Sequence, residues 1–596
     1  MTKLRTTVAV LLGLFAVLTL LDRFVLVELL LRRTSIPLLL AAVMALAAAG
    51  TGALFRRARH IDIPLDLLIG YPILGTLCFL AGTLQVSVWT LLPIMVLGAI
   101  SAIFYLLRRY GHDGSSELLG VPRSSSGRRA SSEEPEELRG TRGTWPMLAV
   151  IAVLVCAFVA AQAPPSSLDE LAYHLAIPHA WVLEARAIEL PLLSQSYFPL
   201  GIESADLIPL LLLGPADGGV ASHLLHLFAA IATTLLVARR TQSWLATAAI
   251  VTTPALAITA GWSLVDSPLA GLFVVLYISL EDDDVRTASA ATAAGLLTKY
   301  TFAPFALIAW AIHWWRKRTL PRWQLLLGGV FFVRNLILTG NPFAPFFSAD
   351  APSVSGYRAL ALADYIFEGT FIDEALGASL IILPVFATGA LALASIALAL
   401  ALFFLAPSSR ILIPFLVVPS VSAAPELRRR VLSVMIAIAV VVQTFLVVWF
   451  TARTNAFSLL AATNTEEEYL RKQRPSYAAI EWLNLQLPTD SRTLLVGTNE
   501  TYWFTRRVRG AGNFDGPRVS RYLDVPSPET LREKLRKDGI THIAVLASAL
   551  PTVDEAKIAE RQTSLSPEAQ RMLAQTLDRY ASNMIARDTA TLFTLR

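Results

Sequence analysis

The stretch WPMLAVIAVLVCAFVAAQAPPSSLDELAYH, residues 145–174, joins a long apolar run to a pair of adjacent carboxylates. The apolar run has about the 20 residues that a helix needs to cross a bilayer. Because backbone groups in lipid must bond internally, this run is predicted to be helical. Asp169 and Glu170 would then lie at the membrane edge, where ionised side chains usually line a functional cavity.

The rest of the chain has the same apolar character. Its 596 residues are 55% hydrophobic and only 16% charged, whereas soluble proteins carry about 25% charged residues. We therefore predict an α-helical polytopic membrane protein with about 13–15 transmembrane helices. Cys78 and Cys156 lie inside apolar runs, where buried free thiols are expected. The candidate spans are 7–31, 35–54, 62–83, 86–107, 146–163, 219–238, 243–261, 265–280, 286–298, 301–316, 322–339, 376–390, 392–406, 409–423 and 431–451.

Basic residues cluster at the ends of these spans and predict the topology. With fifteen spans, all but one of the clusters fall on one side, which the positive-inside rule makes cytoplasmic. The exception is Arg32 with Arg33. The formal net charge of +5 is thereby explained by topology, and no nucleic-acid partner is indicated. The clusters on the predicted cytoplasmic side are Lys3/Arg5, Arg56/Arg57/Arg59, Arg108/Arg109, Arg239/Arg240, Arg316/Lys317/Arg318 and Arg428/Arg429/Arg430.

This topology divides the chain into four parts. Residues 1–110 form N-terminal helices, and the Ser-, Gly- and charge-rich segment 111–145 is predicted to be a disordered cytoplasmic loop. Residues 146–451 form a catalytic transmembrane core with external loops at 164–218 and 340–375. Residues 452–596 alternate β-type runs, such as RTLLVGT and THIAVLA, with helical patterns, and predict a small extracytoplasmic α/β domain.

Acids and cations recur on the predicted outer loops. Asp169 could simply cap the helix that follows it. However, Glu203 lies in the same loop, and Asp266 lies at the edge of a distant span. The cations Lys299, Arg334 and Arg410 are placed near the same face. Cations can hold a phosphate while a carboxylate removes a proton from a hydroxyl, so this set indicates group transfer.

Histidines near the acids do not indicate a metal site. His174 and His179 follow the Asp-Glu pair, and His223 and His226 lie three residues apart. Neither arrangement is H-E-x-x-H, and no cysteine is close enough to complete a zinc site. No metal or cofactor is therefore predicted. His174 is expected to orient an acid or to contact the molecule that accepts the transferred group.

The motifs DELAYHL…FPLGIE, VDSPLA, LLTKYT and RN…TGNPFAP occur in this order over residues 146–450. They resemble the GT-C superfamily of polytopic glycosyltransferases, in particular bacterial members related to protein O-mannosyltransferases (glycosyltransferase family 39) and to aminoarabinose transferases. The resemblance implies a GT-C type fold and a bacterial cytoplasmic (inner) membrane location, with the active site outside. It also implies a polyprenyl-phosphate sugar donor, a glycan, lipid or protein acceptor, and inversion at the anomeric carbon.

The resemblance assigns roles to individual residues. Asp169 matches the catalytic acid of the first external loop and would be the general base, although its neighbour Glu170 is an alternative. Asp266 matches a second catalytic acid. The residues that would bind substrate are Tyr173, His174, Glu203, Lys299, Arg334, Asn341 and Arg410.

Two other functions remain open at this stage. A transporter or lipid flippase would use the acids to carry protons or ions, but it would be expected to show repeated halves and charges at mid-membrane depth. A non-catalytic envelope-assembly protein would use the C-terminal domain as its working part. Release of sugar from a polyprenyl-phosphate donor distinguishes these functions from a glycosyltransferase.

Overall fold

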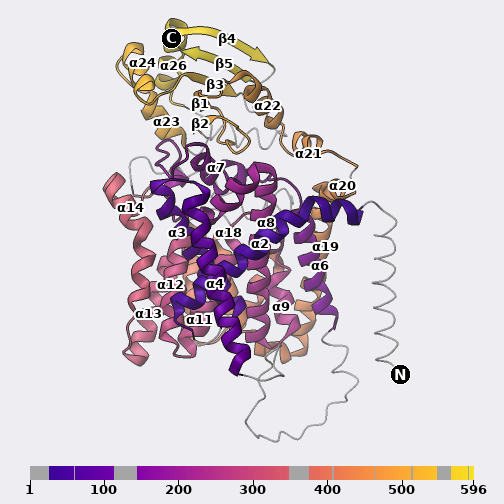
Figure 1. Ribbon diagram of the computed structural model, residues 1–596. Helices are drawn as coiled ribbons and strands as arrows, with labels where there is room; N and C mark the ends of the chain where they lie inside the picture. Colours follow the sequence, from indigo (N-terminus) through magenta and orange to yellow (C-terminus); the bar gives the residue numbers. More distant parts are fainter. Residues whose placement is uncertain are drawn as a thin grey trace, which may run out of the picture.

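The computed structural model describes residues 26–58, 61–112, 144–347, 375–405, 409–461, 463–511, 515–546, 565–587 and 590–595. These residues form a bundle of apolar helices with a small five-stranded sheet at one end (Figure 1). We call this end of the bundle the sheet end. Three predicted segments lie mostly outside the described residues: the first span at 7–31, the loop 111–145 and the loop 340–375.

Six helices among the described residues are long and apolar enough to cross a membrane. These spans confirm the predicted class of helical, multi-pass membrane protein. They run over Ser35–Arg56, Ile63–Leu84, Val88–Arg108, Thr144–Ala161, Glu203–Thr241 and Arg430–Arg453.

Shorter helices fill the space between these spans. Several predicted spans are divided: residues 243–261 form two helices, and residues 322–339 form a 3-10 helix followed by an α-helix. In the first case the second helix begins at Pro254, whose ring nitrogen cannot donate the backbone hydrogen bond of a helix interior. The helices of the bundle are α2 (Leu26–Arg56), α3 (Ile63–Leu84), α4 (Val88–His112), α6 (Thr144–Ala161), α7 (Ala176–Leu183), α8 (Leu207–Thr241), α9 (Trp244–Val251), α10 (Pro254–Thr259), α11 (Asp266–Glu281), α12 (Val285–Thr298), α13 (Phe302–Lys317), η4 (Trp323–Gly329), α14 (Val330–Thr339), α16 (Gly377–Ile382), η6 (Leu383–Phe386), α17 (Ala390–Leu405), α18 (Ser409–Ser422), η7 (Ala424–Arg428) and α19 (Arg430–Arg453).

The connection between α6 and α8 lies at the sheet end and is compact. It contains the π-helix η1 (Glu170–His174), α7 and two short 3-10 helices, η2 (Ser194–Tyr197) and η3 (Glu203–Asp206). Helix α8 is kinked at Gly214, whose φ of +75° and ψ of −175° interrupt the helix. A residue with a β-carbon adopts such a φ at a cost, so glycine suits this position. The kink leaves the start of α8 in the compact connection and its remainder in the bundle.

The C-terminal domain is an α/β domain, as predicted. Its helices are α20 (Ala456–Leu460), α21 (Glu466–Gln473), α22 (Ser476–Gln486), α23 (Gly516–Leu523), α24 (Pro528–Lys537) and α26 (Pro567–Tyr580). Its strands are β1 (Arg492–Val496), β2 (Arg507–Ala511), β3 (His542–Leu546), β4 (Ala581–Arg587) and β5 (Ala590–Leu595). The segment 463–488, which has a helical sequence pattern, forms the two helices α21 and α22, and Pro475 lies between them.

The sheet has the order β2-β1-β3-β5-β4. Strand β1 is parallel to β2 and β3, whereas β5 is antiparallel to β3 and β4. Successive side chains of a strand face opposite sides. Accordingly, Leu494 packs with α23, α24 and α26, and Leu495 packs with α22 on the other face. The sheet is therefore covered by helices on both faces.

Candidate active site

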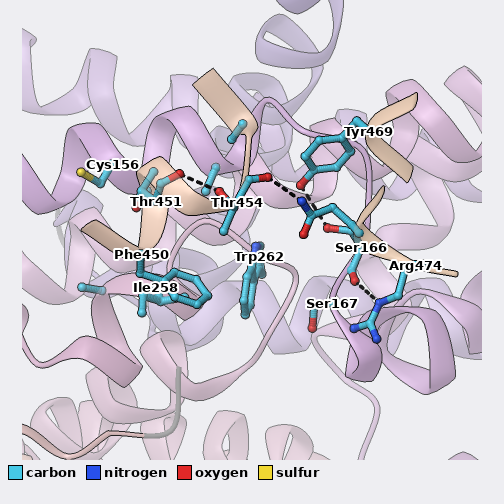
Figure 2. A pocket seen from close by; sticks show the side chains of 15 residues that line it. Cys156, Ser166, Ser167, Ile258, Trp262, Phe450, Thr451, Thr454, Tyr469 and Arg474 are labelled. Carbon is cyan, nitrogen blue, oxygen red and sulfur yellow. Dashed lines mark hydrogen bonds between the residues drawn. The ribbon is translucent and has the colours of Figure 1, made fainter. Parts of the chain in front are cut away.

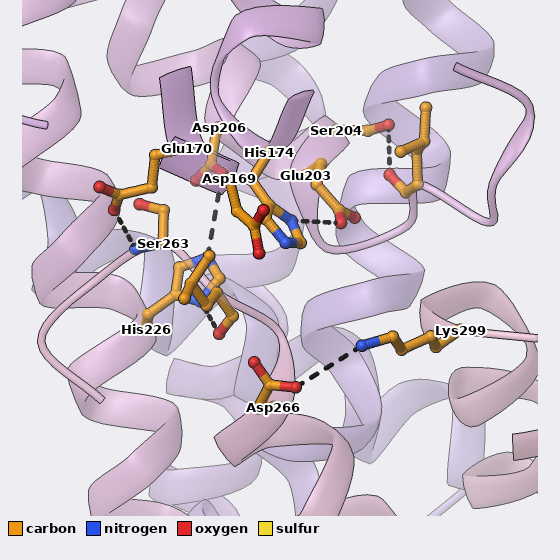
Figure 3. A network of polar contacts seen from close by, with 12 residues as sticks. Asp169, Glu170, His174, Glu203, Ser204, Asp206, His226, Ser263, Asp266 and Lys299 are labelled. Atoms are coloured by element: carbon orange, nitrogen blue, oxygen red, sulfur yellow. Dashed lines mark hydrogen bonds and ion pairs between the residues drawn. The ribbon is translucent and has the colours of Figure 1, made fainter. Parts of the chain in front are cut away.

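Four segments that are far apart in the sequence meet at the sheet end of the bundle. Asp169 precedes η1, Asp266 begins α11, Lys299 follows α12, and Arg410 lies in the first turn of α18. Asp266 at a helix N-terminus and Lys299 at a helix C-terminus both have the sign of charge that the helix dipole favours. The side chains of Asp169, Asp266 and Lys299 point toward one shared space (Figure 3).

Arg410 connects the two carboxylates. Its Nη1 donates to Asp169 Oδ2 at 2.9 Å, and its Nη2 lies 3.0 Å from Asp266 Oδ2. Lys299 Nζ lies 3.5 Å from Asp266 Oδ1. Asp266 is 1% exposed, whereas Asp169 is 30% exposed and Lys299 is 26% exposed. Asp266 therefore holds the cations in place, and Asp169 and Lys299 remain open to a ligand. We call these four residues the carboxylate–cation cluster.

Asp169 does not cap the following helix, in contrast to the simplest interpretation of the sequence. Its backbone is helical, and its side chain forms no capping hydrogen bond. The next turn is a π-helix, in which Leu175 N donates to Glu170 O at 3.1 Å. Single π-turns are frequent at functional sites because they redirect side chains. Here the side chain of Asp169 is directed to Arg410.

Glu170 has a different environment from its neighbour. It is fully buried, and its carboxylate accepts hydrogen bonds from Ser167 N at 3.1 Å and Ser263 N at 2.6 Å. His223 Nε2 lies 2.7 Å from Oε1. Burial alone would raise the pKa of Glu170, but His223 and the two backbone N–H groups together lower this pKa below its ordinary value. Glu170 is thus an ionised anchor turned away from Asp169 (Figure 3).

His174 and Glu203 form a buried pair beside the cluster. His174 Nδ1 lies 2.8 Å from Glu203 Oε1, and both side chains are less than 5% exposed. The His174 Nε2 atom forms no hydrogen bond with a described residue. Tyr173 packs on the His174 ring, with a centroid distance of 4.0 Å. The pair therefore fixes the imidazole and leaves one nitrogen for a further contact.

A second layer of polar residues was not predicted from the sequence. Asp206 is fully buried, with His226 Nε2 3.9 Å from its Oδ2, and Ser263 anchors Glu170. The 3-residue spacing of His223 and His226 was visible in the sequence, but their carboxylate partners are distant in the chain. Among the described residues, no group of three or more His, Cys, Asp or Glu side chains is placed to hold a metal ion.

Two residues predicted to bind substrate have their contacts elsewhere. Arg334 Nη1 donates to Ser196 O at 2.7 Å, and its guanidinium lies over the Phe79 ring. Asn341 donates to Phe346 O and accepts from Phe343 N, so it shapes the turn after α14. Neither residue forms a described contact with the carboxylate–cation cluster. The predicted role of both residues stays a prediction.

The cluster combines the groups needed for displacement at a phosphorylated carbon. A partly exposed carboxylate can accept a proton from a hydroxyl within hydrogen-bond distance. A lysine beside it can stabilise the negative charge of a departing phosphate. Because Arg410 bonds both Asp169 and Asp266, the position of Asp169 is tied to the position of the cations. The arrangement fits transfer of a group from a phosphate to a hydroxyl.

Two solved structures are similar to this chain. ArnT from Cupriavidus metallidurans bound to undecaprenyl phosphate matches with 15% identity and a TM-score of 0.46, over 75% of this chain and 97% of that chain. ArnT from the same organism in the apo state matches with 16% identity and a TM-score of 0.46, over 77% and 98%. No family model and no curated protein matches the chain. Both solved structures belong to the group that the sequence motifs resemble.

Proposed function

We propose that this protein is a membrane glycosyltransferase that moves a sugar from a polyprenyl-phosphate donor to an acceptor hydroxyl. The observation that carries the proposal is the carboxylate–cation cluster, in which Asp169 is partly exposed and is held by Arg410. The predicted topology puts this cluster at the extracytoplasmic face. The membrane location suits the donor, because its polyprenyl chain stays in lipid while its sugar phosphate reaches the bundle end.

The proposed reaction is a single displacement. Asp169 accepts the proton of the acceptor hydroxyl, and the hydroxyl oxygen forms a bond to the anomeric carbon. The bond between that carbon and the donor phosphate oxygen breaks, and the phosphate keeps the electron pair. Since the hydroxyl attacks opposite the leaving group, the anomeric configuration inverts. The phosphate changes from a diester with one negative charge to a monoester with up to two, so a nearby cation stabilises the transition state more than the ground state.

Lys299 is well placed for that cation. Its ion pair with Asp266 is long, at 3.5 Å, and its side chain is one-quarter exposed. A flexible ammonium of this kind can turn to a phosphate oxygen while it stays near Asp266. Arg410 is more rigid, because it bonds two carboxylates at once. We assign Lys299 to the leaving group and Arg410 to the orientation of Asp169.

The test is release and transfer of radiolabelled sugar from a polyprenyl-phosphate donor by the full-length protein in detergent. We expect Asp169→Asn to lower transfer by at least about 100-fold, the usual scale for loss of a general base. The matched control is Asp217→Asn, which changes an exposed acid in α8 and should keep wild-type transfer. Equal rates for Asp169→Asn and wild type would refute the assignment of the base.

A proton-coupled transporter is the second candidate. The observation in its favour is the set of buried carboxylate–histidine pairs, Glu203 with His174, Glu170 with His223 and Asp206 with His226. Chains of such groups can carry protons through a bundle. Wild-type protein in proteoliposomes that moves protons but leaves the donor sugar uncleaved would favour this function over the glycosyltransferase.

A further inference from the structure

Three arginines of the C-terminal domain gather on one face of its sheet. Arg507 and Arg509 are two residues apart on β2, so their side chains leave the same face of the strand. Arg492 of β1 is the register partner of Arg507 and lies on that face as well. Strand β2 contacts α7 (Figure 1), and all three guanidiniums reach toward Glu184, the residue after α7. We call Arg492, Arg507 and Arg509 the arginine trio.

Glu184 satisfies two members of the trio but not the third. Its Oε2 lies 2.8 Å from Arg492 Nη2, and its Oε1 lies 3.1 Å from Arg509 Nη2. Arg507 Nε is 3.8 Å from Oε2, which is too long for a hydrogen bond, and it donates instead to Leu183 O at 3.4 Å. Positive charge therefore exceeds the charge of this carboxylate.

Asp538 offsets only part of the excess. Its carboxylate accepts a hydrogen bond from the Tyr522 hydroxyl at 2.6 Å, and Arg492 Nη1 contacts its backbone oxygen, at 3.3 Å. Two carboxylates thus stand against the three guanidiniums of the trio. Arg506 adds a further cation next to them in the chain, and its Nε donates to a neutral acceptor, Leu487 O.

Two buried N–H groups of the trio have no acceptor. Arg509 Nη1 and Arg492 Nε form no hydrogen bond with any residue that the structure describes. Arg509 is 16% exposed, and burial lowers its pKa because the charged guanidinium loses hydration. A buried charged donor without an acceptor costs more free energy than a neutral one. The joint between β2 and α7 therefore lacks an anionic acceptor.

Another arginine at the sheet end shows the balanced arrangement. A cavity of about 220 Å³ between α6, α10, α19 and α21 is lined by Trp262 and Arg474 (Figure 2). Arg474 Nε donates to Ser166 O at 2.6 Å, and its Nη1 lies 3.8 Å from Glu500 Oε1. One guanidinium has one carboxylate there, whereas the trio does not.

A small recess lies beside the trio, between α7 and β2. Its volume is about 10 Å³, which is room for one oxygen-sized atom. A second recess of about 20 Å³ is also lined by Arg509. A ligand can therefore insert one or two oxygen atoms and keep its remainder outside. The polar residues that line the first recess are His179, Glu184, Thr501, Arg506, Arg507 and Arg509.

We propose that the arginine trio binds a phosphate group at the joint between the C-terminal domain and α7. One phosphate oxygen enters the recess beside Arg509, and the others meet Arg507 at its exposed rim. Guanidinium forks match phosphate oxygens in pairs, and the bound anion reduces the repulsion among the three cations, so it stabilises the docked domain. The phosphate belongs to the headgroup of an anionic phospholipid or to a soluble molecule.

This site is separate from the carboxylate–cation cluster. None of the four residues of the cluster lines either recess. The phosphate at the trio is therefore not the leaving group of the proposed displacement. The inference goes beyond the proposed function, and its test uses no sugar donor.

The test measures protection of single arginines in the full-length protein. The reagent is p-hydroxyphenylglyoxal, which modifies guanidinium groups, and the rate at each arginine is followed by peptide mass spectrometry. In dodecyl maltoside at constant ionic strength, we expect about 20 mM inorganic phosphate to slow modification of Arg507 at least about fivefold, as when four-fifths of the sites are filled. Arg471 is the internal control, because it is 54% exposed, against 47% for Arg507, and has its own partner, Glu481.

Two further samples identify the source of the phosphate. They are nanodiscs of phosphatidylcholine alone and nanodiscs that also contain phosphatidylglycerol. Slower modification of Arg507 in the phosphatidylglycerol discs supports a lipid headgroup, and protection by inorganic phosphate alone supports a soluble ligand. An unchanged rate at Arg507 in every sample, or equal slowing at Arg507 and Arg471, overturns the proposal.

A variant tests the geometry of the site. Arg509→Gln removes the guanidinium that lines both recesses, and we expect phosphate to protect Arg507 less than about twofold in this variant. Arg471→Gln is the matched control and should keep wild-type protection. Full protection of Arg507 in a folded Arg509→Gln variant would contradict the assigned site. Should this variant aggregate, the wild-type samples decide the result by themselves.

Discussion

Two adjacent acids illustrate how strongly a residue's role depends on its surroundings. Asp169 is 30% exposed and shares Arg410 with Asp266. Glu170 is fully buried, and its carboxylate is bonded to two backbone N–H groups that belong to different segments. A group that must accept a proton from a substrate needs access, and a group that joins two segments needs burial. We therefore propose the chemical role for Asp169 and a positioning role for Glu170.

Replacement of Glu170 by Gln should destabilise the protein. The variant loses the negative charge beside His223 and places an amide nitrogen where two N–H donors converge. Removal of one partner from such a buried set costs about 3–5 kcal/mol. We expect a clearly lower thermal midpoint in detergent, whereas the exposed matched change Glu467→Gln should leave the midpoint unchanged. If Glu170→Gln has the same thermal midpoint as wild type, the proposed anchoring role of Glu170 is wrong.

Lys299→Met tests the cation of the cluster. Methionine keeps most of the apolar stem and removes the charge, while Arg410 still pairs with Asp266. The phosphate gains charge as the sugar leaves. We therefore expect kcat to fall by roughly 10- to 100-fold and the donor affinity to fall less. Lys317→Met, which removes a half-exposed ion pair with Asp283, is the control. A rate within twofold of wild type would leave Lys299 as an ordinary membrane-edge lysine.

At the scale of elements, the connection between α6 and α8 is the surface on which the C-terminal domain docks. Trp503 Nε1 donates to Pro165 O, and Thr501 N donates to Leu171 O. Glu184, just after α7, receives Arg492 at 2.8 Å and Arg509 at 3.1 Å. The same connection carries Asp169 and Glu170. Docking of the domain therefore constrains the segment that carries Asp169, the proposed general base.

His179 in α7 makes this docking surface sensitive to acid. It packs against Tyr502, with a ring centroid distance of 5.3 Å, and burial lowers the pKa of His179 to about 4. Between pH 6.5 and 4 the unfolded chain binds a proton that the folded chain does not. Stability therefore falls as the pH falls through this window, by up to about 3 kcal/mol at ~1.4 kcal/mol per pH unit.

The measurement compares thermal midpoints of wild type and His179→Gln in detergent from pH 7 to pH 4.5. Glutamine carries no charge at any pH, so the wild-type midpoint should fall more steeply on acidification than that of the variant. Identical slopes for the two proteins would contradict the assigned buried, neutral state of His179.

For the whole molecule, α7 and the C-terminal domain lie at the same end of the bundle (Figure 1), and α7 follows directly on the segment that carries Asp169. Helix α6 runs through the bundle from Thr144 to this end and continues into the connection that carries Asp169. Thr144, the first residue of α6, therefore lies at the opposite end of the bundle. The basic clusters at span ends predict that this opposite end is cytoplasmic.

Topology can be tested with single cysteines at positions 130 and 524 in a chain without Cys78 and Cys156; residue 524 is exposed and represents the domain around residue 520. We expect an impermeant maleimide, applied to intact spheroplasts, to label position 524 and to label position 130 only after lysis. Labelling of position 130 in intact spheroplasts would reverse the orientation and remove the extracytoplasmic site from the proposal.

The class of the protein could be predicted from the sequence alone, and so could a larger set of candidate residues to which the cluster belongs. Long apolar runs require helices in lipid, and alternation of short apolar runs with helical patterns predicted the α/β domain, because both signals are local in the chain. Asp169, Asp266, Lys299 and Arg410 were among the residues named because acids and cations recur on the predicted outer loops and match the motifs that resemble GT-C enzymes. These local signals located most spans to within a few residues.

Which of these charges meet became visible only in the folded chain. Arg410 is 241 residues from Asp169 in the chain, and no local pattern encodes their contact. The different surroundings of Asp169 and Glu170 come from a π-turn and from Ser263 on a distant loop. The cavity beside Trp262 likewise needs α6, α10, α19 and α21 together. Burial and pairing are properties of packed segments, so they become visible only when the chain is folded.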